Sequence, residues 1–135
     1  MALPNGAAGY QLGDGNRNEP VMGYASAPVT ATDTATLTAA QVLNGIILAT
    51  PTAAADYTLP TVADFEAGGI SSAGVGSTFD FVIINLASSN YDITIVTNTG
   101  WTVTGGGVVV VQEASSARVR ARKTSATTWQ LYRIA

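Results

Sequence analysis

Alternating hydrophobic and polar positions dominate the second half of the chain. In the segment "STFDFVIIN" (77–85), Phe79, Phe81 and Ile83 fall on one face of a strand. Asp80, Val82 and Ile84 fall on the other face. Further strand-like segments follow at intervals of about 8–12 residues, with polar turns between them. They cover 91–97, 101–107, 108–112, 116–124 and 127–134.

The first half of the chain combines short strands with two short helices. Thr38 is a candidate cap for a helix over 39–43, which Asn44 and Gly45 end. Thr61 is a candidate cap for a second helix, which ends at Gly68 and Gly69. Strand-like segments occupy 28–38, 46–50 and 55–60, and the last two are closed by Pro51 and Pro60.

Neither expected helix is long enough to connect two parallel strands as in a βαβ unit. We therefore predict an all-β fold with antiparallel pairing, a β-sandwich or jelly-roll-like barrel that carries one or two short helices. With 135 residues, the chain is expected to form one domain with a sizeable core.

The segment 1–28 differs from the rest, because prolines and glycines interrupt any long element. We predict an extended N-terminal arm over 1–28, followed by a single β domain over 29–135. Four side chains in the arm have the charge or aromatic character expected of partner contacts: Tyr10, Asp14, Arg17 and Glu19. The glycines beside them would let the arm turn sharply.

The arm also contains two incomplete ligand motifs. Gly13 and Gly15 begin a dinucleotide-binding pattern, but Asn18 stands where the third glycine is required. Asp14, Asn16 and Asn18 occupy the first, third and fifth positions of a calcium loop, although the later glycine and glutamate are missing. A looser calcium site near Asp14 and a simple turn both remain open, and no metal ligand is assigned.

The composition argues against catalysis. The chain has no histidine and no cysteine, so it lacks the commonest general base, metal ligand and thiol nucleophile. We expect no catalytic, cofactor-binding or metal-binding residue, and no enzymatic activity. No apolar run approaches the length of a membrane span, and the start lacks the features of a signal peptide, so we expect a soluble protein made in a cytoplasm.

Charge is sparse and unevenly distributed. All nine acidic residues lie within 1–114, whereas five of the six basic residues lie within 115–135. The alternation in "SARVRARKT" places Arg118, Arg120 and Arg122 on one face of a strand. These arginines either bridge copies of the chain or pair with acids of their own fold. Because the whole protein is acidic, nucleic acid is a disfavoured partner.

Several segments together resemble small head proteins of tailed bacteriophages, particularly phages of marine and other aquatic bacteria. They are "YQLGDGNRNEP", "LTAAQVLNGIILATP", "YTLPT", "STFDFVIIN", "TGWTV" and "ARVRARKT…WQLYRI". The resemblance implies a capsid decoration, or cement, protein: a homotrimer that binds the major capsid protein on the outside of the virion and stabilises the shell. It supplies no binding residues.

A second hypothesis is a tail-fibre or head-fibre module that contacts host glycans. Trp101, Tyr91 or Tyr57 on an exposed loop would then form a stacking platform for a sugar. Because aromatic side chains usually contribute through burial, the alternative for Trp101 is a core position at the end of a strand.

Overall fold

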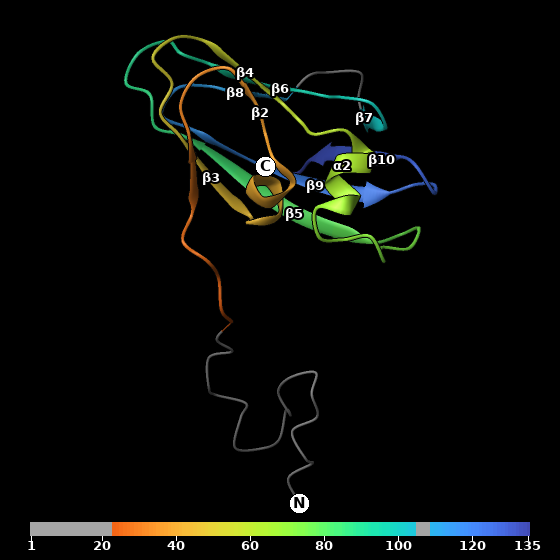
Figure 1. Cartoon of the computed structure of the whole chain (residues 1–135). Coiled ribbons are helices and arrows are strands. Elements are labelled where there is room, and N and C mark those ends of the chain that lie inside the picture. The colour runs from red at the N-terminus through yellow and green to blue at the C-terminus, as the bar shows by residue number, and fades with distance from the viewer. Residues whose placement is uncertain (1–22, 105–108) are drawn as a thin grey trace, which may run out of the picture.

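The computed structural model describes residues 23–104 and 109–135 (Figure 1). Tyr10, Asp14, Arg17 and Glu19 lie outside the described residues, as does the candidate calcium loop. The described residues form two sheets in two layers, accompanied by two short helices (Figure 1). The coarse expectation of a β-rich fold with two short helices is confirmed.

The larger sheet has six strands in the order β1-β3-β5-β9-β10-β7. These are β1 (Val29–Ala31), β3 (Ile46–Ala49), β5 (Thr78–Asn85), β9 (Ser116–Lys123), β10 (Trp129–Arg133) and β7 (Trp101–Val103). The smaller sheet has four strands in the order β2-β4-β6-β8. These are β2 (Ala35–Thr36), β4 (Ala55–Thr58), β6 (Ile93–Val96) and β8 (Val109–Val111).

The expectation of antiparallel pairing is wrong for much of the fold. Between β1 and β8 the chain passes alternately from one sheet to the other. Through the first six strands, each return to a sheet adds a strand that is parallel to the previous strand of that sheet. Thus β1, β3 and β5 are parallel neighbours, as are β2, β4 and β6. Strand β7 is parallel to β10. Antiparallel pairing joins β5 to β9, β9 to β10 and β6 to β8.

Both helices begin and end where the sequence indicates. Helix α1 (Ala39–Leu43) has Thr38 as its N-cap in a capping box with Gln41. Helix α2 (Val62–Ala67) has Thr61 as its N-cap, and the Thr61 hydroxyl accepts a hydrogen bond from the amide of Asp64 at 3.1 Å. No helix in the described part of the chain is long and apolar enough to cross a bilayer.

An aromatic cluster joins α2 to the inner face of the six-stranded sheet. The ring of Phe65 on α2 stacks on Phe79 with a centroid distance of 5.3 Å. The same ring packs edge to face against Trp101 at 5.1 Å and against Trp129 at 5.7 Å. Edge-to-face and offset contacts of this kind stabilise a core beyond the burial of their area.

A buried ion pair stabilises the same region. The Lys123 ammonium, which is almost fully buried, forms a salt bridge with the Glu66 carboxylate. The indole Nε1 of Trp129 donates a second hydrogen bond to Glu66 Oε1 at 2.9 Å. These hydrogen bonds from Lys123 and Trp129 lower the pKa of Glu66. Glu66 therefore joins α2 to both β9 and β10.

Candidate binding surface

The six-stranded sheet has an outer face, which we define as the side turned away from the core. Along β5, Phe81, Ile83 and Asn85 are buried, whereas the side chains between them are only half-buried. Along β9, buried and exposed positions alternate without exception from Ser116 to Lys123. The sequence alternation therefore assigned the two faces of both strands correctly, and the outer face remains accessible in the described part of the protein.

One part of this surface, the cationic half, consists of Asp80, Arg118, Arg120 and Arg122. Asp80 on β5 is in register with Arg120 on β9. Arg120 Nε donates to Asp80 Oδ1 at 2.7 Å, and Arg120 Nη2 donates to Oδ2 at 3.1 Å. Arg118 donates to the same Oδ2 through Nε at 3.0 Å and Nη2 at 2.6 Å. One carboxylate thus holds two guanidinium groups in place.

The cluster perturbs the titration of Asp80. The hydrogen bond from Arg120, supported by Arg118, lowers the pKa of Asp80 to about 2. Arg122 lies on the same face opposite Thr78, and it forms no ion pair within residues 23–104 and 109–135. Three arginines against one aspartate leave this half positively charged at neutral pH.

The apolar half of the outer face lies beside the cationic half. It consists of Ile46, Leu48, Val82, Ile84 and Leu86. The parallel register of β3 and β5 pairs Ile46 with Val82 and Leu48 with Ile84. Leu86 is 53% exposed and Ile46 is 39% exposed. With the half-buried Leu48, Val82 and Ile84 between them, they form an apolar surface of the kind that another polypeptide often covers.

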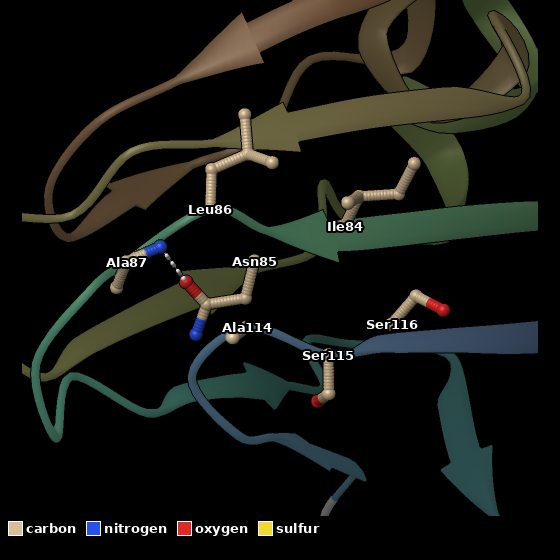
Figure 2. A pocket seen from close by; sticks show the side chains of 7 residues that line it. All are labelled: Ile84, Asn85, Leu86, Ala87, Ala114, Ser115 and Ser116. Carbon is tan, nitrogen blue, oxygen red and sulfur yellow. Dashed lines mark hydrogen bonds between the residues drawn. The ribbon is translucent and has the colours of Figure 1, made fainter.

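A shallow depression of about 450 Å³ lies at the end of the apolar half. Figure 2 shows Ile84 and Leu86 projecting to one side of β5, while Asn85 projects to the other. The Asn85 amide donates to the carbonyls of Tyr91 at 2.8 Å and Val111 at 3.1 Å, and its Oδ1 accepts from the Ala87 amide at 3.0 Å. Asn85 thereby fixes the turn that presents Leu86.

Four acidic residues come from segments that the structure brings next to one another, and we call this region the acidic end. It consists of Asp33, Asp56, Asp92 and Glu113. The Ala55 amide donates to the carbonyl of Asp92, and the Asp56 amide donates to the hydroxyl of Thr34, next to Asp33. Asp92 and Glu113 line one hollow of about 330 Å³.

The described residues contain no group of three or more histidine, cysteine, aspartate or glutamate side chains placed to hold a metal ion. The four carboxylates of the acidic end form no ion pair within the described ranges.

The structure brings the three predicted arginines together on one face. Arg118 and Arg120 pair with an acid of their own fold, as one of the two hypotheses expected. The hypothesis that they also bridge copies stays a prediction.

The proposed aromatic platform is wrong for two of its three residues. Trp101 is buried, and its Nε1 donates to the carbonyl of Pro60 at 2.8 Å. Tyr57 is fully buried and donates to the carbonyl of Thr32 at 3.0 Å. Burial raises the pKa of Tyr57 to about 12. Tyr91 is half-buried. Neither Trp101 nor Tyr57 can stack against a sugar in this fold.

Sequence analysis missed the apolar half and the acidic end. The signal for the apolar half was present, because the run "FVII" places apolar side chains on both faces of one strand. The acidic end had no local signal, since its members come from four separate segments of the chain.

Comparison with known proteins gave no match: no family model, curated protein or solved structure matches the chain.

Proposed function

We propose that this chain is a structural protein of a tailed bacteriophage, which decorates the outside of the capsid as a homotrimer and stabilises the shell. The observation that carries the proposal is the outer face, where exposed apolar side chains lie directly beside a preorganised arginine cluster. Protein interfaces commonly combine an apolar centre with arginine, and such a surface suits adhesion. The resemblance of several segments to phage head proteins supplies the identity of the larger assembly.

The body of the protein suits a mechanical role. Two sheets share one core, and the six-stranded sheet is held to α2 by the aromatic cluster and by the Glu66–Lys123 ion pair. We propose that this sandwich-like body serves as a rigid support that presents the outer face to neighbouring proteins. Adhesion of this kind requires no reacting group, in agreement with the absence of histidine and cysteine from the sequence.

We assign different contacts to the two ends of the chain. In the proposal, Tyr10, Asp14, Arg17 and Glu19 of the arm bind the major capsid protein, and the arginines of β9 contact neighbouring decoration proteins. An arm that becomes ordered on docking can cover a wide surface, although its ordering reduces the net affinity.

Cosedimentation of the purified chain with mature head shells of the phage that encodes it would test the function. We expect saturable binding, and shells that carry the protein should withstand a higher temperature before releasing DNA. A chain lacking residues 2–19 should bind the shells more weakly while keeping its fold, as judged by circular dichroism. Labelled protein found at the tail tip, or no binding to any shell, would contradict the proposal and favour a fibre protein.

A further inference from the structure

We propose that the outer face of one copy binds the acidic end of a second copy, so that these two surfaces form the contact between subunits. This inference rests on the proposed function in one respect: it identifies the molecule that lies next to each subunit in the proposed assembly. The occupant of the outer face is thus another copy of this same chain.

The first argument is charge complementarity within one sequence. Arg118, Arg120 and Arg122 lie on the outer face, and at the acidic end no described basic side chain forms an ion pair with an acid. Surfaces of opposite sign steer two copies toward each other and penalise contacts between like surfaces. The outer face keeps a net positive charge, because the single negative charge of Asp80 offsets the charge of only one of the three arginines.

The second argument is the apolar half, which charge alone does not explain. Leu86 and Ile46 are exposed, and a partner with apolar surface would bury them. Next to the acidic end, the loop before β4 exposes the methyl groups of Ala53 and Ala54. Small side chains allow close approach to a sheet, so in the proposal this loop covers the apolar half and Asp56 meets the arginines.

The third argument is the arrangement of the surfaces along β5. The cationic half begins at the register position of Thr78 and Arg122, and Leu86 lies eight residues further along the chain. At about 3.3 Å per residue, these positions are roughly 26 Å apart. Glu113 directly precedes Ala114, which lines the depression beside Leu86 (Figure 2). The two surfaces share no residue, so in this proposal one copy uses both of them, and repeated contacts of this kind can close into a ring.

Charge reversal tests the contact on the purified full-length chain, without capsids. Self-association would be followed by sedimentation velocity at about 50 mM and about 500 mM NaCl. We expect Arg122→Glu to weaken association about tenfold at low salt, and the variant Asp92→Lys/Glu113→Lys to do the same. The variant that combines all three substitutions should regain most of the lost affinity, because each altered surface then meets its altered partner.

Two matched controls isolate the outer face. Arg133→Glu makes the same charge change as Arg122→Glu, but Arg133 donates to the carbonyl of Val110, away from the outer face, so association should be unchanged. Leu86→Asp should abolish association, whereas Val75→Asp should leave it intact, because Val75 is exposed in the loop between α2 and β5.

A wild-type chain that stays monomeric at high concentration would overturn the inference. So would an oligomer that is indifferent to Arg122→Glu and Leu86→Asp, or a combined variant that regains nothing. Normal self-association with no binding to head shells would instead refute the capsid function and leave this contact standing.

Discussion

Asp80 on β5 and Arg120 on β9 lie directly opposite each other, and their side chains meet through two hydrogen bonds of 2.7 and 3.1 Å. A forked contact of this geometry aligns the guanidinium plane with the carboxylate and restricts both side chains. Arg118 adds two more donors to the same carboxylate. The outer face therefore presents Arg118 and Arg120 in a defined arrangement before any partner arrives.

The first prediction concerns the pH dependence of this contact. The pKa of Asp80 is about 2 in the folded chain, below the value of about 3.9 for an unfolded aspartate. A lowered folded pKa means that the contact stabilises the fold fully above about pH 4 and loses its effect as the pH falls toward 2. Carboxyl carbon NMR should show Asp80 titrating near pH 2, and Arg120→Gln should move that midpoint upward. An unchanged midpoint in the variant would contradict the assigned cause.

The second prediction concerns Gly100, which precedes β7. Its φ is +91°, and a β-carbon placed there would lie 2.6 Å from Val62 Cγ2 and 2.9 Å from the Thr127 carbonyl oxygen. Gly100→Ala should lower the free energy of unfolding by about 2–4 kcal/mol, from the combination of backbone strain and overpacking. Denaturant unfolding would measure the change.

Gly76 provides the matched control for Gly100. Its φ is +94°, but a β-carbon there would meet no atom within 4 Å. Gly76→Ala should therefore show only the backbone term, about 1–2 kcal/mol. Equal losses at the two positions would mean that the close contact with Val62 contributes nothing.

The third prediction concerns the ion pair between Glu66 and Lys123. Glu66→Gln keeps an acceptor for Trp129 but leaves the buried Lys123 ammonium without a counter-charge, so stability should fall by about 3 kcal/mol. The double variant Glu66→Gln/Lys123→Met should be more stable than Glu66→Gln alone, because the uncompensated charge is then removed. Strictly additive losses in this double-mutant cycle would show that the two groups are not coupled.

The fourth prediction concerns Asn85, whose side chain makes three hydrogen bonds in the core. Asn85→Ala leaves the carbonyls of Tyr91 and Val111 and the amide of Ala87 without that partner, and should lower stability by about 2–4 kcal/mol. The exposed Ser88, in the loop after Leu86, is a suitable control, and Ser88→Ala should change stability by less than about 0.5 kcal/mol. Thermal unfolding of both variants would provide the comparison.

Local features of this fold could be predicted from the sequence, whereas contacts between distant segments could not. Caps and helix ends depend on neighbouring residues, so Thr38 and Thr61 were identified as N-caps from their local sequence. The two faces of β9 follow from its alternation, so the common placement of Arg118, Arg120 and Arg122 was also predictable. By contrast, Asp80 lies 40 residues from Arg120 in the chain, and no local pattern identifies it as their partner.

The sequence by itself determined the elements and their buried faces, because these depend on periods of two or a few residues. Only the tertiary structure decided how the strands pair, since an alternating strand looks the same in a parallel and in an antiparallel sheet. It also decided that Trp101 and Tyr57 point into the core and that the segments of four distant acids lie next to one another. Those outcomes depend on which segments the chain brings together as it passes between the two sheets, and short-range patterns carry no information about that path.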